Sequence, residues 1–303
     1  MKVFKLICKY IGLLKALTFV NKKKKAENIF FDYFGWKKSS NYHVPIYVKK
    51  LGFQSRISEF YNLHKDKRIF ILANGPSLKN VDLSILKNEI IIGCNGIYKL
   101  TDKYNLEIDY FFCEDEVQLE IRANDLKKIK SKYKFSAIYN AHLVKDFKNW
   151  IFYYVPRCLG EKHNKYYWNE LYPQFSKDFA SIVHQGNTIT FMMLQFAFFL
   201  GVKEVYILGL DFNYGNLNKF FKPGKIKITK ENYDLVKECH FDENYYKIGD
   251  YMGVPNLEDQ KKAFQIANKV FSENGRKIIN LNEKSGLDIF EKKSIDEMVK
   301  IIK

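Results

Sequence analysis

Residues 69–78 read Ile-Phe-Ile-Leu-Ala-Asn-Gly-Pro-Ser-Leu, an apolar run that ends abruptly in a small polar loop. Such a run is typical of a strand buried on both faces, as in parallel sheets. The carboxyl end of such a strand is where open α/β sheets bind nucleotides. Gly75 permits close approach of a ligand and Pro76 stiffens the turn. Ser77 is placed to cap a following helix, whose free N–H groups attract phosphate.

The same pattern recurs along the chain. Apolar runs at 90–93, 110–113 and 205–208 give way to Cys94-Asn95-Gly96, Glu114-Asp115 and Gly209-Leu210-Asp211-Phe212. Further strands are expected at 135–139, 151–155 and 277–281. Because these strands alternate with helical stretches, we predict an α/β fold with a Rossmann-like, mostly parallel sheet and helices on both faces.

The composition is that of a globular protein in a reducing compartment. The 303 residues contain five cysteines, an odd number, with no Cys-x-x-Cys pair. We therefore expect reduced thiols in a cytoplasmic protein. The longest apolar stretch, 189–202, contains Gln195 and reads as a buried helix rather than a membrane span.

The positive charge is concentrated at the amino end. Residues 1–50 hold twelve lysines and two acids, so they carry +10 of the net +16. We predict a basic amphipathic helical appendage at 1–64 and a catalytic domain at 65–303. Within the appendage, 1–25 is expected to lie on an anionic membrane surface, on the inner face of the cytoplasmic membrane. A surface helix packed on its own domain is the alternative.

Residues 213–256, called the lid segment below, mix Gly, Asn, Lys and Tyr with little periodicity. A connection this long is usually a lid, a binding loop or a disordered segment. It contains His240, which can take a proton from a sugar hydroxyl if Asp242 or Glu243 tunes it. An exposed loop histidine is the alternative.

Two further clusters have both a functional and a structural interpretation. Gly186-Asn187-Thr188 precedes an apolar helix and points N–H groups at one place, which suits a phosphate, although Asn187 or Thr188 can simply be the helix cap. Glu114 and Asp115 can hold Mg²⁺ against a diphosphate, or cap the next helix. The other histidines show no metal-ligand spacing, so we predict no metal site built by the protein. They are His43, His64, His142, His163 and His184.

These elements together resemble a known group of enzymes. Residues 74–78, Cys94-Asn95 with Tyr98, the Gly-Asn-Thr helix and the block 201–212 are similar to the bacterial lipooligosaccharide sialyltransferases. They are also similar to flagellin nonulosonate transferases of the motility accessory factor type and to domains like archaeal 6-hydroxymethylpterin diphosphokinase. The likeness extends over roughly residues 68–279.

The resemblance implies a GT-A-like sialyltransferase variant that uses a CMP-activated nonulosonic acid, transfers the sugar with inversion and needs no cofactor. In the sialyltransferases a tyrosine directly follows the aspartate block, whereas here Asn213 holds that place and Tyr214 comes one later. Their catalytic histidine lies near a pattern like Asn256 to Asp259, where this chain has none, so His240 becomes the predicted base. The predicted catalytic residues are therefore His240 and Tyr214. The predicted nucleotide- and donor-binding residues are Asn74, Gly75, Pro76, Ser77, Asn95, Glu114, Asp115, Gly186, Asn187, Thr188, Asp211 and Asn213.

Three functions follow from these observations. The first is a glycosyltransferase acting on a bacterial surface glycan or glycolipid. No nucleic-acid partner is expected for it, and both a monomer and a homo-oligomer are compatible with the sequence. The second is a pterin diphosphokinase-like enzyme that uses ATP and Mg²⁺, for which Glu114 and Asp115 would be essential. The third is a non-catalytic basic module that binds membrane or RNA through residues 1–50.

Overall fold

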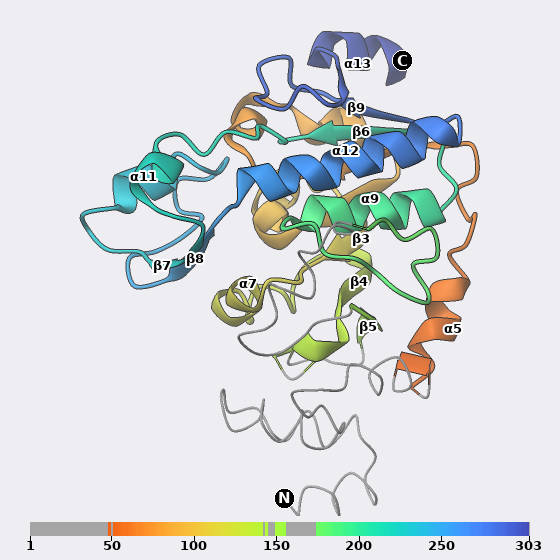
Figure 1. The fold of residues 1–303 in the computed structure, drawn as a ribbon, viewed down its shortest axis with the longest axis horizontal. Coiled ribbons are helices and arrows are strands. Elements are labelled where there is room, and N and C mark those ends of the chain that lie inside the picture. The colour runs from red at the N-terminus through yellow and green to blue at the C-terminus, as the bar shows by residue number, and fades with distance from the viewer. Residues whose placement is uncertain (1–47, 50, 142, 145–148, 156–173, 303) are drawn as a thin grey trace, which may run out of the picture.

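A computed structural model describes residues 48–49, 51–141, 143–144, 149–155 and 174–302. Its centre is a parallel sheet with the strand order β10-β9-β6-β1-β2-β3-β4-β5 (Figure 1). The strands are β1 Arg68–Leu72, β2 Ile91–Cys94, β3 Ile108–Phe112, β4 Ser131–Ala137, β5 Trp150–Tyr153, β6 Glu204–Leu208, β9 Lys277–Asn280 and β10 Glu291–Lys292. All seven predicted strands are confirmed, and every pair in this sheet is parallel. The predicted α/β fold is therefore correct.

Helices connect the strands of the sheet, and the strands form two runs in opposite directions from the centre. The α-helices are α5 Phe53–Ser58, α6 Tyr98–Lys103, α7 Glu116–Ile121, α9 Ile189–Phe199, α12 Leu257–Glu273 and α13 Ile295–Ile302, and the 3₁₀ helices are Pro76–Asn80, Leu83–Leu86, Asn95–Ile97 and Ile138–Asn140. From β1 the chain proceeds through β2 to β5 in one direction, and from β6 it proceeds to β9 and β10 in the other. Because such crossovers are right-handed, α6 and α7 belong on the face opposite α9 and α12. Helices α9 and α12 lie side by side (Figure 1).

The reversal of direction fixes where a ligand binds. Strands β1 and β6 are paired neighbours, yet the chain leaves them toward opposite ends of the sheet. Their following loops therefore separate and leave a crevice at their carboxyl ends, the usual ligand position of doubly wound sheets. Asn74 and Gly75 follow β1, and Asp211 follows β6.

Helix α9 is the centre of the core. All of its residues from Thr190 to Phe199 are buried, which explains why the segment is apolar on every side. Its Phe196 ring lies 5.3 Å from Phe112 and 5.0 Å from Phe135, centroid to centroid. This aromatic layer holds α9 on the sheet and so fixes the position of the helix start.

The predicted appendage, residues 1–64, is described by the structure only from residue 48 onward. Residues 1–47 lie outside the described part, so the amphipathic helix stays a prediction. The described residues 51–64 pack on the sheet: Phe53 lies 5.3 Å from Phe152 and Phe60 lies 4.8 Å from Tyr133, centroid to centroid. The stretch 51–64 therefore contributes to the core of the sheet domain. Among the described residues, no helix is both long and apolar enough to cross a bilayer.

The lid segment has more regular structure than its sequence indicates. It contains α10 Leu217–Phe220, α11 Tyr233–Lys237 and an antiparallel hairpin of β7 Gly224–Lys227 with β8 Tyr251–Val254. Its return half is anchored to the body by buried Tyr245 and Tyr246. Sequence periodicity cannot reveal these elements, because each is only four or five residues long and its contacts are distant in the chain.

Candidate functional site

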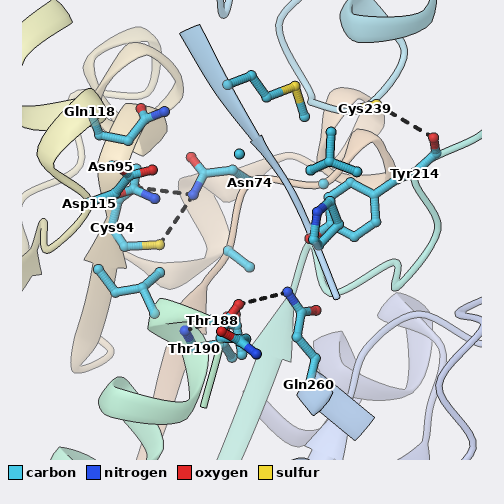
Figure 2. A pocket seen from close by; sticks show the side chains of 18 of the residues that line it. Asn74, Cys94, Asn95, Asp115, Gln118, Thr188, Thr190, Tyr214, Cys239 and Gln260 are labelled. Atoms are coloured by element: carbon cyan, nitrogen blue, oxygen red, sulfur yellow. Dashed lines mark hydrogen bonds between the residues drawn. The ribbon is translucent and has the colours of Figure 1, made fainter. Parts of the chain in front are cut away.

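A cavity of about 930 Å³ opens at the carboxyl edge of the sheet. It is formed by the loops after β1, β2, β3 and β6, the starts of α9 and α12, and the lid segment (Figure 2). Twelve of the fourteen predicted site residues line it: Asn74, Gly75, Asn95, Glu114, Asp115, Gly186, Asn187, Thr188, Asp211, Asn213, Tyr214 and His240. The carboxyl ends of parallel strands meet at one edge, which is why residues so distant in sequence converge.

Asn74 and Asn95 line the cavity, and each has a buried side-chain oxygen without a hydrogen-bond partner. The side-chain amide of Asn74 donates to the Cys94 carbonyl at 3.2 Å and to its Sγ at 3.1 Å, which fixes the orientation of the amide (Figure 2). The Oδ1 atoms of both asparagines are buried and have no partner. A buried acceptor without a partner costs about 1–3 kcal/mol, so a ligand N–H or O–H that reached either atom would offset a cost that the free protein bears.

Ser77 and Pro76 do not line this cavity, because Asp211 occupies the space beside them. Oδ2 of Asp211 accepts from the Ser77 amide at 3.2 Å and the Ser77 hydroxyl at 3.0 Å. The segment after Gly75 is a five-residue 3₁₀ helix without a side-chain cap. Ser77 is therefore a hydrogen-bond partner of Asp211, and its predicted role as cap of a phosphate-binding helix is wrong.

Asp211 itself uses both carboxylate oxygens inside the protein. Its Oδ1 accepts from the Asn282 side chain at 2.8 Å, so it joins the loops after β1, β6 and β9. Burial raises the pKa of Asp211 despite these hydrogen bonds, because the charged form is partly desolvated. Its main role is to hold the Gly75 loop in place.

The contacts at the start of α9 favour the interpretation of Thr188 as a helix cap. Its Oγ1 accepts from the Thr190 amide at 3.3 Å as the N-cap. Asn187 has a positive φ of 55° and donates to Asp259 at 3.3 Å. Both residues still line the cavity, so the helix start faces it.

The acidic pair after β3 is partly committed to the fold. Asp115 is the N-cap of α7 and accepts from the Val117 amide at 2.8 Å, as in the capping interpretation. Oε1 of Glu114 accepts from the Gln185 side chain at 2.9 Å. Burial raises the pKa of Asp115, which indicates a cavity wall unfavourable to extra negative charge.

His240 lines the cavity in an aromatic environment. Its ring stacks on Tyr245 at 4.0 Å between centroids, and its buried Nδ1 has no partner. Burial and the nearby positive charge of Arg122 lower the pKa of His240 to about 3. Asp242 and Glu243 form ion pairs with Lys99 and Lys79 instead, at 2.5 and 2.6 Å. The predicted tuning by these two carboxylates is therefore wrong.

Arg122 organises the part of the lid around His240. Its guanidinium carbon lies 4.1 Å from the Tyr245 ring centroid, and it donates to Gln118 at 2.7 Å and to the Tyr245 carbonyl at 2.9 Å. The Tyr245 hydroxyl accepts from the Gly96 amide at 3.1 Å. Because the arginine is 4% exposed, its charge acts on the cavity through a medium of low dielectric.

Tyr214 enters the cavity from the loop after β6, beside Gln260 (Figure 2). Burial raises the pKa of Tyr214 to about 12, so its hydroxyl stays protonated and can donate a hydrogen bond. Asn213 turns its Oδ1 to the Gly215 amide at 2.9 Å. The Tyr214 hydroxyl, which also interacts with the Gln260 side chain, is therefore the group of this pair that can donate to a ligand.

Several cavity residues were not predicted from sequence. Gln118, Gln185, Gln260 and Lys225 line the cavity, and Arg122 lies behind it. Glutamines carry no motif, and no spacing rule links Arg122 to residue 245. Asn256 and Asp259, by contrast, follow a helix-cap pattern: Asn256 is the N-cap of α12 and accepts from the Asp259 amide at 3.3 Å. Over the described ranges, no cluster of three His, Cys, Asp or Glu side chains can hold a metal ion.

A family model described as 6-hydroxymethylpterin diphosphokinase MptE-like matches residues 47–217. This match spans 171 of 303 residues, counted inclusively, which is more than half of the chain. The chain belongs to the MptE-like family. The matched region of this MptE-like protein runs from the first described residues through β6 and Asp211, so it includes the loops that carry both asparagines.

Two solved structures are similar to this MptE-like protein. The MAf glycosyltransferase from Magnetospirillum magneticum AMB-1 has 10% identity and a TM-score of 0.45, with 80% of this chain and 38% of that chain covered. Monomeric CstII has 22% identity and a TM-score of 0.40, with 74% of this chain and 85% of that chain covered. This chain thus spans well under half the length of the MAf enzyme. None of the curated proteins matches it.

Proposed function

We propose that this protein is a glycosyltransferase that takes a sugar from a CMP-activated donor, a nonulosonic acid such as sialic acid, and transfers it to a bacterial surface glycan. The cavity of about 930 Å³ is within the usual range for small-molecule sites and large enough for a nucleotide and a sugar. The family resemblance of the Asn74 and Asn95 loops supports the same donor class.

The observation that carries the proposal is the excess of acceptors in the cavity wall. Asn74 and Asn95 present buried oxygens without partners. Five carboxylates line the cavity against one lysine, Lys225, and although Asp211 accepts hydrogen bonds on both oxygens within the protein, their charges repel a polyphosphate. Such a wall binds hydroxyl and amino groups well and a bare polyphosphate poorly. A CMP-activated nonulosonic acid supplies many hydroxyls, a cytosine amino group, one phosphate and one carboxylate, and so carries less negative charge than a nucleoside triphosphate.

The proposed reaction is one displacement. The acceptor oxygen forms a bond to the anomeric carbon while the bond from that carbon to the CMP phosphate oxygen breaks, and CMP leaves with the electron pair. Tyr214 donates a hydrogen bond to the departing phosphate, and Arg122 stabilises its charge from behind the cavity. The acceptor proton passes to His240, whose pKa rises when the donor phosphate offsets the charge of Arg122.

A thermal-shift series with CMP, CDP, UDP, GDP and ATP tests the donor class. We expect CMP to stabilise the protein most, CDP less because of its second phosphate, and the others to have little effect. A ligand at 100 times its Kd contributes about 2.7 kcal/mol. Stabilisation by ATP with Mg²⁺ but by no cytidine nucleotide would contradict the proposal.

A diphosphokinase-like activity is the second candidate, and the family description together with Glu114 and Asp115 in the cavity favours it. Here the two carboxylates would hold Mg²⁺ against the phosphates of ATP, since Mg²⁺ typically uses one or two carboxylates plus substrate oxygens. This reaction depends on the charge of Asp115.

Asp115→Asn separates the two activities. Asparagine is an equally good N-cap, so the fold is retained, while the negative charge is removed. We expect CMP-sugar turnover to persist at about the wild-type level, because no metal takes part in that reaction. The control is Glu120→Gln, an exposed carboxylate on the same helix. Loss of a Mg²⁺-dependent ATP reaction in Asp115→Asn alone would establish the diphosphokinase.

The pH profile tests His240. The free protein has His240 with a pKa of about 3, so the imidazole is neutral throughout pH 5–8. A base works in its deprotonated form, so kcat/KM, which reports the free protein, should show no acidic limb near pH 6.5. The profile of kcat reports the donor complex, in which the pKa of His240 is raised. Its acidic limb should therefore lie at higher pH than any acidic limb in kcat/KM. An acidic limb near pH 6.5 in kcat/KM that His240→Gln removes would show that the imidazole is not desolvated in the free protein.

A further inference from the structure

The hairpin of the lid segment has one buried face and one exposed face. Along β8, Met252 and Val254 are buried, whereas Tyr251 and Gly253 are exposed. Register pairs Lys227 with Tyr251 and Lys225 with Gly253, so both lysines lie on the exposed face. Lys225 also lies over the Tyr251 ring, 4.7 Å from its centroid.

The chain leading into this hairpin is unusually basic. Residues 213–230 contain five lysines and no Asp or Glu: Lys219, Lys222, Lys225, Lys227 and Lys230. In the part of the chain that is described, no ion pair involves any of these lysines. The local positive charge is therefore available to a partner.

Exposed apolar side chains accompany the lysines. Phe220 is 68% exposed at the end of α10, and Tyr251 is 43% exposed on the hairpin. Ile248, just before the start of β8, is 53% exposed. Single exposed apolar residues are common, but two exposed aromatic side chains together with lysines that are unpaired within the described ranges are the composition of a membrane-interface surface, although Asp250 lies beside Tyr251.

This surface adjoins the mouth of the cavity. Pro223, Gly224 and Lys225 line the cavity, together with residues 252–256 of the returning strand. The hairpin and α11 project from the sheet domain (Figure 1). A partner that covers the exposed face therefore lies next to the opening.

We propose that the lid surface, defined as Lys219, Phe220, Lys222, Lys225, Lys227 and Tyr251, docks on an anionic lipid bilayer. The lysines meet the lipid headgroups, and Phe220 and Tyr251 enter the interface. Each lysine near such a surface strengthens binding by about fivefold. Docking places the cavity mouth at the headgroup level, where a lipid-linked acceptor would be presented. The binding itself is independent of the chemistry proposed above.

Sedimentation of the full-length protein with vesicles tests the electrostatic part. The vesicles contain phosphatidylcholine with about one third phosphatidylglycerol, or phosphatidylcholine alone, and no donor is added. The triple variant Lys219→Gln, Lys222→Gln and Lys227→Gln should bind the anionic vesicles roughly 100-fold more weakly than wild type.

The chain offers a control with the same charge change. Lys67, Lys203 and Lys277 are exposed at the amino ends of β1, β6 and β9, the edge of the sheet away from the cavity. Their triple change to glutamine should leave vesicle binding unchanged. Equal weakening by both triple variants would show that net charge alone acts and would overturn the proposal.

Insertion is measured at the lid itself, so that binding by residues 1–47 cannot hide the result. The tryptophan introduced by Phe220→Trp should be quenched by brominated lipid in anionic vesicles, beyond the quenching seen in the wild type. The control is Leu63→Trp, at a site outside the lid segment that is 50% exposed in the wild type. Its introduced tryptophan should not be quenched. No added quenching in Phe220→Trp, together with undiminished binding of the lid triple variant, would overturn the proposal. Binding of a soluble acidic glycan but not of vesicles would also overturn it and assign the surface to the glycan instead.

Discussion

Gly75→Ala should weaken CMP binding by roughly 100-fold and lower the free energy of unfolding. A β-carbon at this position would overlap Oδ2 of Asp211 and lie 2.5 Å from the carbonyl oxygen of Gly209. The second contact is with backbone that continues β6, because the Gly75 amide bonds to that same carbonyl at 2.9 Å. The two loops must therefore move apart.

The expected magnitudes follow from this forced displacement. Overpacking of this kind costs about 1–3 kcal/mol of stability, and more where backbone resists. A shift of about 1 Å in binding residues weakens function by roughly 100-fold. The measurements are thermal unfolding and CMP titration on the same preparation.

Gly253→Ala is the matched control. It also lines the cavity, but a β-carbon there meets no atom within 4 Å. We expect wild-type stability and CMP affinity. If Gly75→Ala behaved like Gly253→Ala, the tight junction between the β1 and β6 loops would not exist in solution.

Asn95→Ala and Asn95→Gly should each weaken CMP binding by roughly 10- to 100-fold, the effect of losing one hydrogen bond to a buried acceptor. Asn95 has a φ of 51°, a region that asparagine and glycine tolerate better than alanine. Both variants also lose an unpaired buried acceptor, so the backbone effect is seen in their difference: Asn95→Ala should be about 1 kcal/mol less stable than Asn95→Gly.

The comparison separates the side chain from the backbone. Binding restored in Asn95→Gly but lost in Asn95→Ala would mean that the turn geometry matters and that Oδ1 contacts no ligand. The readouts are isothermal titration for affinity and denaturant unfolding for stability.

The strands could be predicted because parallel strands buried on both faces leave apolar runs that any reader of the sequence can find. The convergence of Asn74, Asn95 and Asp211 followed from topology, since the carboxyl ends of such strands share one edge. The predicted cap at Ser77 failed because its partner Asp211 is 134 residues away, and no local pattern records that pairing.

The environment of His240 could not be predicted from the neighbouring sequence either. Its low pKa depends on burial and on Arg122, which is held beside it by packing on Tyr245. The hairpin of the lid segment was missed for a similar reason: its two strands are separated by the whole of α11 and pair across the connection. Contacts between segments distant in sequence therefore account for most of what the sequence could not predict.

The return half of the lid segment is joined directly to the two asparagine loops. The Phe241 amide donates to the Asn74 carbonyl at 3.1 Å, and the Tyr245 ring occupies the space that a β-carbon on Gly96 would need. Substitutions along this junction disturb both sides at once, whereas Gly253 on the hairpin side faces open space. In the proposed enzyme, substitutions in the hairpin should therefore change acceptor preference while the loops that carry Asn74 and Asn95 keep their geometry.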